Sequence, residues 1–257
     1  MTSVLCITNK KGCDAMQIVT IANQKGGTGK TATAAALAQA AAYSGKRVLA
    51  IDLDPQSNLS FALDAQGTGT SYDLIEKKIP ARRLIQTAHG IDLIPASWSL
   101  ATLQSAPGSA KRLATALQPL KGKYDIVIID TPPTIGELQY NALQASTGLI
   151  IPLQAEIYSI KGLYQIIDTA EQFKKSNPAL TVKGVLITRY NGRSTLAKQM
   201  RQSIEDTAAK LDIPFIGVIR EAVSVQEAAA LKENLFEYAP NSNPAQDYMR
   251  AFESIIS

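Results

Sequence analysis

The sequence predicts an α/β fold in which a twisted, mostly parallel sheet is covered by helices on both faces. Short runs rich in β-branched residues alternate with longer helix-like stretches from Gln17 onward. Such alternation is typical of βαβ units, in which each helix brings the next strand in parallel. The loop after the first strand is also glycine-rich and leads directly into an alanine-rich helix. Ligands of such sheets bind beyond the carboxyl ends of the strands, so this loop is the first candidate site.

The individual elements follow from the composition of successive segments of the chain. The strands are short runs rich in β-branched residues, and helix-like stretches lie between them. The expected strands span residues 17–23, 47–52, 91–95, 125–130, 148–153, 182–188 and 214–219. The expected helices span residues 31–43, 109–117, 137–145, 157–175, 196–211 and 245–256.

Residues 16–257 are expected to form a single domain, since no repeat, low-complexity tract or Pro/Gly-rich linker divides them. Residues 1–15 are interpreted as an N-terminal extension, because a second methionine, Met16, directly precedes the first predicted strand. This segment is expected to be a disordered tail or the result of a start codon placed too far upstream. The alternative is a short strand or arm that packs on the domain.

Composition narrows the class of protein. The 257 residues are 46% hydrophobic, enough for a sizeable core, and the formal charge of +4 is only mildly basic. The sequence contains no run of 18 apolar residues, so a membrane-spanning helix is not expected. Both cysteines, Cys6 and Cys13, precede the domain, so a disulfide framework or cysteine-held cluster is not expected within it. A cytoplasmic location fits this pattern.

The glycine-rich loop has the composition of a phosphate-binding site. Its glycines let backbone N–H groups curl around phosphate oxygens, and the helix that follows adds a partial positive charge. Lys30 would reach the β- and γ-phosphates, and the Thr31 hydroxyl would ligate Mg²⁺. The residues expected to bind ATP here are Lys25, Gly26, Gly27, Thr28, Gly29, Lys30, Thr31 and Ala32.

Lys25 is an additional lysine beside the first glycine of this loop. With it, residues 25–31 resemble the deviant Walker A motif of the ParA/MinD ATPases, a branch of the P-loop NTPases. The resemblance implies that Lys25 crosses a dimer interface and touches the partner's nucleotide. There it would stabilise charge on the transferring phosphoryl group, as an arginine finger does.

Two further segments extend the resemblance, which covers nearly all of residues 16–257. The run after the second strand resembles the family's switch segment, which implies that Asp54 orients the attacking water. Asp52 would lie nearer the metal, through water. The strand that ends at Asp130 resembles a Walker B strand, which implies a carboxylate near Mg²⁺. Pro132 and Pro133 then force an extended exit that suits a γ-phosphate-sensing switch.

The resemblance also assigns residues around the base. Arg189, Asn191, Pro240 and Asn241 occupy places that line the adenine pocket in relatives. Asn234 stands where relatives often have glycine, and asparagine tolerates the left-handed conformation such a turn requires.

Three features that mark other branches of the family are not found in this sequence. Relatives of the nitrogenase iron protein need core cysteines, and MinD relatives end in a basic amphipathic helix that lies on membrane. Residues 245–257 carry one Arg, one Asp and one Glu, so their apolar residues are expected to pack on the sheet. The chain therefore resembles the small, Soj-like ParA proteins, because residues 1–15 are too few for an N-terminal helix-turn-helix domain.

Non-specific DNA binding in the small ParA proteins uses basic residues of the C-terminal half. The candidates here are Arg193, Lys198, Arg201 and Arg220. The alternative is a solvated helix face, which charge runs usually form. Relatives often have another arginine where this chain has Ala222, so its DNA binding would be weaker. Without an aromatic row beside these residues, contact is expected with phosphates rather than bases.

The resulting prediction is an ATPase that binds MgATP, dimerises around it, binds DNA non-specifically and partitions plasmid or chromosomal DNA. A ParB-like partner would stimulate slow hydrolysis, and the protein would associate with the nucleoid. The alternatives are a MinD-like protein-positioning switch, a nucleotide-holding scaffold, and an enzyme resembling dethiobiotin synthetase or a kinase. His89 is expected at the surface or in a loop, and Trp98 in the core.

Overall fold

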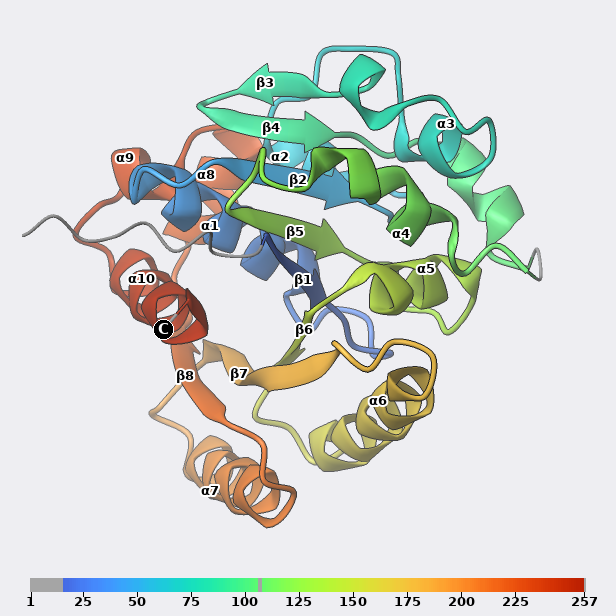
Figure 1. Ribbon diagram of the computed structural model, residues 1–257. Coiled ribbons are helices and arrows are strands. Elements are labelled where there is room, and N and C mark those ends of the chain that lie inside the picture. The colour runs from blue at the N-terminus through green and yellow to red at the C-terminus, as the bar shows by residue number, and fades with distance from the viewer. Residues whose placement is uncertain (1–15, 106–107, 257) are drawn as a thin grey trace, which may run out of the picture.

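The computed structural model describes residues 16–105 and 108–256. The predicted extension at 1–15, with Cys6 and Cys13, lies outside the described residues. One eight-stranded sheet forms the centre of the molecule, with the strand order β3-β4-β2-β5-β1-β6-β7-β8 (Figure 1). The strands are β1 (Gln17–Ile21), β2 (Val48–Asp52), β3 (Gln86–Ala88), β4 (Ile91–Ile94), β5 (Ile126–Asp130), β6 (Gly148–Leu153), β7 (Thr181–Tyr190) and β8 (Phe215–Arg220).

All neighbouring strands pair in parallel except β3 and β4, which form an antiparallel hairpin. The predicted mostly parallel sheet is therefore confirmed. Each of the seven predicted strands is present, and the short edge strand β3 is the one that was not expected. His89 lies at the exposed tip of the hairpin with a φ of 51°, which confirms its predicted surface position.

Helices cover both faces of the sheet (Figure 1). One face packs against α1, α2, α8, α9 and α10. The other face packs against α3, α4 and α5 on one half and α6 and α7 on the other. The helices are α1 (Lys30–Tyr43), α2 (Asn58–Ala62), α3 (Ser71–Ile75), α4 (Arg112–Leu117), α5 (Glu137–Ala145), α6 (Ser159–Lys174), α7 (Thr195–Lys210), α8 (Ser224–Leu231), α9 (Leu235–Tyr238) and α10 (Asn243–Ile256), with 3₁₀ turns η1 (Ala81–Arg83), η2 (Trp98–Leu103) and η3 (Gln118–Leu120).

The last helix, α10, packs its apolar face against the body of the protein. Tyr248, Phe252 and Ile255 are buried in the same cluster as α1, and α10 also contacts β8. This confirms that the apolar residues of 245–257 pack within the domain. Among the described residues, no helix combines the length and the apolar character that crossing a membrane requires.

The turn around Asn234 differs from the prediction. Asn234 has an extended backbone (φ −70°, ψ 123°), and its side chain caps α9 by accepting a hydrogen bond from the Phe236 N–H. The left-handed residue is instead Lys232, with a φ of 58°, at the end of α8. The expectation of a left-handed Asn234 was therefore wrong: here asparagine serves as a helix N-cap, a position that it also favours.

The register of the central strands brings the predicted acidic residues together. β1 lies between β5 and β6, and β5 lies between β1 and β2. Asp52, the last residue of β2, is directly opposite Asp130, the last residue of β5. Ile21, the last residue of β1, pairs with the same Asp130. The loops after β1, β2 and β5 therefore leave the sheet side by side.

Candidate functional site

The loop between β1 and α1 adopts a conformation that requires glycine. Gly27 and Gly29 have φ angles of 75° and 78°, in the left-handed region that side chains rarely adopt. Gly29 is the N-cap residue of α1. A β-carbon there would lie 3.3 Å from the side chain of Thr188, so this glycine also makes room for β7.

Three polar residues outside the loop fix its backbone. The Thr188 hydroxyl donates to the carbonyls of Thr28 (2.8 Å) and Leu153 (3.1 Å). Asn23 accepts from the Lys25 N–H at 3.0 Å and donates to a carbonyl of β6. Gln154 donates to the Gly27 carbonyl at 2.9 Å. The sequence reasoning gave none of these residues this role, because single Thr, Asn and Gln residues carry no signal until the fold brings them together.

Lys30 begins α1 with its side chain folded under the loop. The residue is buried, and its ammonium donates to the Lys25 carbonyl at 3.1 Å. Burial lowers the pKa of Lys30, while the negative charges of Asp130 and Asp54 act to raise it. A buried cation beneath exposed backbone N–H groups is suited to hold phosphate oxygens.

Asp130 and Thr31 bring two oxygen atoms together at the end of β5. The Thr31 hydroxyl donates to Oδ2 of Asp130 at 2.7 Å. Oδ1 of Asp130 is fully buried and has no hydrogen-bond partner. Burial raises the pKa of Asp130 well above its usual value, and the nearby charge of Asp52 adds to this effect. A buried, unpartnered carboxylate oxygen beside a hydroxyl fits Mg²⁺, which binds through few protein ligands and completes its shell with phosphates and water.

Asp52 is used differently, because the protein itself satisfies both of its oxygens. Oδ1 accepts from the Asp54 N–H at 2.9 Å, and Oδ2 accepts from the N–H and the hydroxyl of Ser60 at 2.8 and 2.7 Å. Burial raises the pKa of Asp52 to about 6, although the bonds from Ser60 act to lower it. Asp52 therefore holds the segment that follows β2, and its predicted contact with the metal through water remains a prediction.

Asp54 lies in the turn that Asp52 supports. It is nearly buried, and its Oδ1 accepts from the Gln56 N–H at 2.9 Å. The turn ends at Ser57, a left-handed residue (φ 57°) that precedes α2. The negative charge of Asp54 also acts to raise the pKa of Lys30.

Lys25 forms an ion pair within its own chain. Its ammonium contacts the carboxylate of Glu156, in the loop between β6 and α6. Both side chains are partly exposed, at 37% and 50%. Lys25 is thus at the surface of the loop, while Lys30 is beneath it.

The residues assigned to the adenine pocket separate into two groups. A cavity of about 100 Å³ lies beside the loop and is lined by Ala32, Arg189 and other residues of β7, β8 and α8. Asn191 is exposed and does not line this cavity; its side chain accepts from the Arg193 N–H.

The role of Pro240 and Asn241 at the base stays a prediction, and the structure places Pro240 away from the phosphate loop. Pro240 lines a different cavity with Tyr43, the last residue of α1. A helix of 14 residues is roughly 21 Å long, and the phosphate loop is at its other end. Asn241 follows Pro240 directly. The family resemblance placed these residues by their order in the chain, and the chain returns to the opposite end of α1.

Large apolar side chains are exposed around the site. Trp98, Ile135, Ile157 and Tyr158 follow β4, β5 and β6 and are exposed by 70%, 53%, 63% and 75%. These strands are parallel to β1, so the four residues lie at the same edge of the sheet as the loop. Trp98 was predicted to be in the core, and that prediction was wrong: it lies on a 3₁₀ turn outside the sheet.

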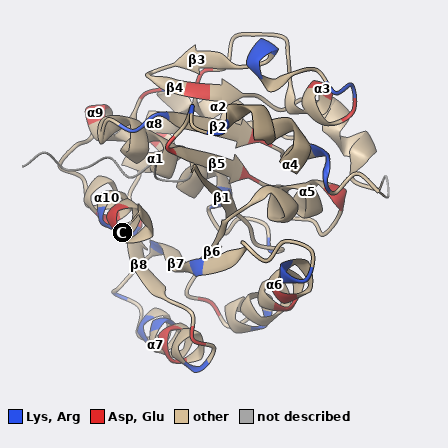
Figure 2. Cartoon of the chain, viewed as in Figure 1, with Lys and Arg blue, Asp and Glu red and all other residues tan. Residues whose placement is uncertain are grey.

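The four basic candidates for DNA contact also divide into two groups. Arg193 and Lys198 are exposed, and neither has an ion-pair partner among residues 16–105 and 108–256. Arg201 pairs with Glu205 at 2.6 Å on α7, a helix that carries both basic and acidic residues (Figure 2). Arg220 binds both oxygens of Asp247, at 2.9 and 2.8 Å. Half of the predicted cations are therefore already paired.

Comparison with known proteins agrees with this site. A family model described as an AAA domain matches residues 16–182. The chromosome-partitioning ATPase Soj of Thermus thermophilus is 37% identical over 242 residues, covering 93% of this chain and 95% of the relative.

Solved structures of nucleotide-bound proteins are also similar to this chain. McdA from Cyanothece in complex with ATP has a TM-score of 0.80 at 26% identity, with 93% of this chain and 95% of the other covered. The septum site-determining protein MinD from Pyrococcus horikoshii, complexed with Mg-ADP, has a TM-score of 0.78 at 25% identity over the same shares of both chains. The loop, the strand-end aspartates and these similarities agree: the chain belongs to the ParA/Soj family of deviant Walker A P-loop ATPases.

Proposed function

We propose that this protein is a partition ATPase that binds MgATP, dimerises around it, hydrolyses it, and binds DNA without sequence preference while dimeric. The observation that carries the proposal is the free Oδ1 of Asp130, buried beside Thr31 and next to the buried Lys30. A buried carboxylate oxygen without a partner is unfavourable in the free protein, and a metal–nucleotide complex would satisfy it.

In this proposal, each residue of the site has a separate task. Residues 26–31 hold the phosphates through their N–H groups, and Lys30 offsets the charge on the β- and γ-phosphates. Thr31 and Asp130 hold Mg²⁺, which when bound would neutralise part of the phosphate charge. Asp54 orients the attacking water, because its carboxylate is held by the turn after β2, and β2 ends beside Asp130.

The test of the chemistry compares Lys30→Ala with Asp54→Ala. Lys30→Ala should weaken ATP binding in calorimetry by at least tenfold, about 1.4 kcal/mol. Asp54→Ala should still bind MgATP and release no phosphate. Unchanged affinity in Lys30→Ala would disprove the phosphate site. Wild-type turnover in Asp54→Ala would transfer the water-positioning role to another residue.

The exposed apolar side chains support dimerisation through the face that bears the nucleotide. Trp98, Ile135, Ile157 and Tyr158 are exposed at the same edge of the sheet as the phosphate loop, and exposed apolar residues on one face are typical of an interface. Lys25 lies on the same face, and the partner's nucleotide would replace Glu156 as its counter-charge. Lys25→Ala should keep monomeric ATP binding and lose the ATP-dependent dimer in light scattering. A mutant dimer as tight as wild type would refute the cross-subunit role.

The proposed DNA contact uses Arg193 and Lys198, since Arg201 and Arg220 are engaged in ion pairs. Two free cations per chain would bind DNA weakly, and a dimer would double their number on one surface. DNA binding should therefore depend on ATP, be insensitive to sequence and weaken steeply with salt. A shift assay on random duplex with ATP, ADP or no nucleotide tests this, with Arg193→Ala/Lys198→Ala as the variant.

The remaining parts of the proposal are a ParB-like partner that stimulates hydrolysis and association with the nucleoid through DNA. The similarity to a chromosome-partitioning ATPase favours DNA as the cargo over a protein. Equal DNA binding in all three nucleotide states, or none in any, would instead favour a MinD-like protein-positioning role. Absence of phosphate release from the wild-type protein itself would favour a nucleotide-holding scaffold.

A further inference from the structure

A cavity of about 680 Å³ lies between the segment of α3 and η1 and the segment of α4 and η3. Its floor is formed by Leu74, Ile75 and Leu120, all exposed by 2% or less. The cavity therefore reaches the apolar core on this side of the sheet. Its volume is within the range of about 300–1,000 Å³ that is typical of small-molecule sites. No residue of the phosphate loop lines it, nor do Asp52, Asp54 or Asp130.

The rim of this cavity is strongly basic. Lys78, Arg82, Lys111 and Lys123 line it, and all four are exposed. None of them has an ion-pair partner in the part of the chain that the structure describes, and no described Asp or Glu lines the cavity. Like charges gathered around an apolar hollow repel one another, so a ligand with negative charge would be favoured.

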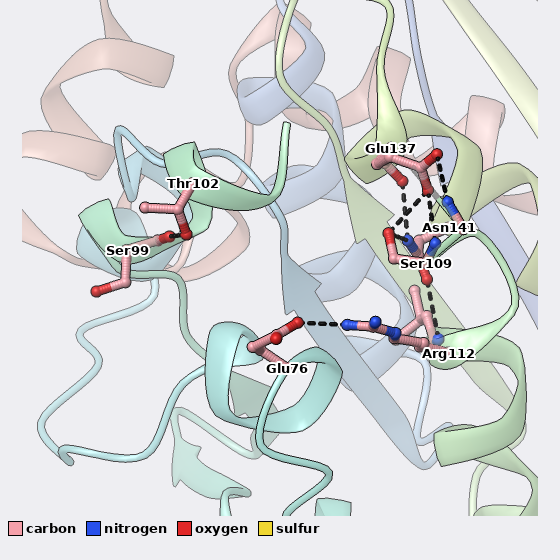
Figure 3. Close-up of polar contacts among 9 residues, drawn as sticks. Glu76, Ser99, Thr102, Ser109, Arg112, Glu137 and Asn141 are labelled. Atoms are coloured by element: carbon pink, nitrogen blue, oxygen red, sulfur yellow. Dashed lines mark hydrogen bonds and ion pairs between the residues drawn. The ribbon is translucent and has the colours of Figure 1, made fainter. Parts of the chain in front are cut away.

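The walls of the cavity are held in place by polar contacts (Figure 3). Arg112 on α4 forms an ion pair with Glu76, which follows α3, so the two walls are joined. Ser109 donates to Glu137 of α5 at 2.8 Å, and Asn141 of α5 accepts from the Leu113 N–H at 3.0 Å. These contacts lie within the protein and join the two walls, so a ligand would have little to order when it binds.

We propose that this cavity is a binding site for a free small molecule that has an apolar body and an anionic head group. The apolar body would lie on the floor, and a carboxylate, sulfate or phosphate would lie among the rim cations. A free small molecule is favoured over a partner helix because the cavity reaches buried residues and its described lining comes only from residues 74–82 and 108–123, whereas a helix needs a long open groove.

Isothermal titration calorimetry tests the site with decanoate, kept below its critical micelle concentration, and with 8-anilinonaphthalene-1-sulfonate as a second anion. Decyltrimethylammonium, with the same chain length and the opposite charge, is the matched control ligand. Arg82→Glu/Lys123→Glu should weaken binding of the anions at least tenfold and should not weaken the cation. Ala116→Trp, which fills the cavity from its wall, should also weaken the anions at least tenfold.

Lys46→Glu/Lys210→Glu is the matched control variant, because it makes the same charge change at exposed positions elsewhere. It should bind the anions as wild type does. Circular dichroism confirms that each variant is folded. The proposal would be overturned if neither anion binds the wild type. It would also be overturned if the anions bind Arg82→Glu/Lys123→Glu as tightly as they bind the wild type. A third outcome would also overturn the proposal: the wild type floats with phosphatidylglycerol vesicles and Ala116→Trp does not. That result would assign this surface to membrane binding.

Discussion

The ends of β2 and β5 look alike in the sequence and are used differently in the structure. Each is an apolar strand that ends in a fully buried aspartate, and the two aspartates are opposite each other in the sheet. Asp52 accepts three hydrogen bonds, from Ser60 and Asp54. Asp130 accepts one, from Thr31, and its Oδ1 has none.

This difference separates a structural role from a ligand-binding role. A buried carboxylate whose bonds come from the protein stabilises the segment that supplies them. A buried carboxylate oxygen without a bond destabilises the free protein, so it is expected where a ligand completes the site. Asp52 should therefore contribute mainly to stability, and Asp130 mainly to function. Four experiments separate the two roles.

The largest effect is expected from Asp130→Asn. Phosphate release in the presence of Mg²⁺ should fall at least 100-fold, about 2.7 kcal/mol, because the metal loses a charged ligand. The free energy of unfolding without nucleotide should not fall, since an unpartnered carboxylate is removed. Phosphate release during a Mg²⁺ titration and urea unfolding measure the two quantities. Asp168→Asn, at an exposed position of α6, is the control; wild-type turnover in Asp130→Asn would place the metal elsewhere.

Asp52→Ala should have the opposite profile. It removes the acceptor of three buried hydrogen bonds, so the free energy of unfolding should fall by about 2–3 kcal/mol. The affinity for ATP should change much less than the stability. Urea unfolding and calorimetry measure these changes. A loss of ATP affinity without a loss of stability would contradict the structural role.

Ser60→Ala removes one of these bonds from the donor side. The Ser60 hydroxyl donates to Asp52 at 2.7 Å and accepts from the Ala96 N–H at 2.8 Å. The free energy of unfolding should fall by about 1 kcal/mol. Ser99→Ala, at an exposed position, should leave it unchanged. An equal effect in both variants would show that the Ser60 bond contributes nothing specific.

The smallest expected effect is a pH dependence. Burial raises the pKa of Asp52 from 3.8 to about 6 in the folded protein. Protonated Asp52 therefore contributes to the free energy of unfolding. This contribution is fully present below pH 3.8 and is lost as the pH rises through 6. Wild type should therefore lose stability relative to Asp52→Asn between pH 4 and 7 in urea unfolding. A relative gain over this range would mean that hydrogen bonding to the ionised form outweighs burial.

Most of the fold could be predicted from the sequence because the long elements carry strong signals. Parallel strands are buried on both faces and appear as continuous apolar runs, and the six predicted helices are longer stretches between these runs. The helices that were not predicted are short: α2, α3, α8 and α9 have five, five, eight and four residues. Segments of this length are stabilised by tertiary packing rather than by a local pattern.

The candidate site was predictable only where the residues follow one another in the chain. The phosphate loop and the strand-end aspartates could be located from local spacing. The anchoring role of Thr188, 160 residues away from Thr28, could not. Trp98 was misjudged because apolar character predicts burial, whereas this residue is exposed on a 3₁₀ turn after β4.

The arrangement of β1, β2 and β5 has a thermodynamic consequence. The phosphate loop, the Asp54 turn and Asp130 come from three adjacent strands at the centre of the sheet. No nucleotide site exists unless these strands are paired, so binding is linked to unfolding of the whole sheet rather than of one loop. Free ligand at 100 times its dissociation constant would add about 2.7 kcal/mol to the stability of the entire domain. Nucleotide exchange would thereby alter how strongly the fold as a whole is held together, and not only the shape of its active face.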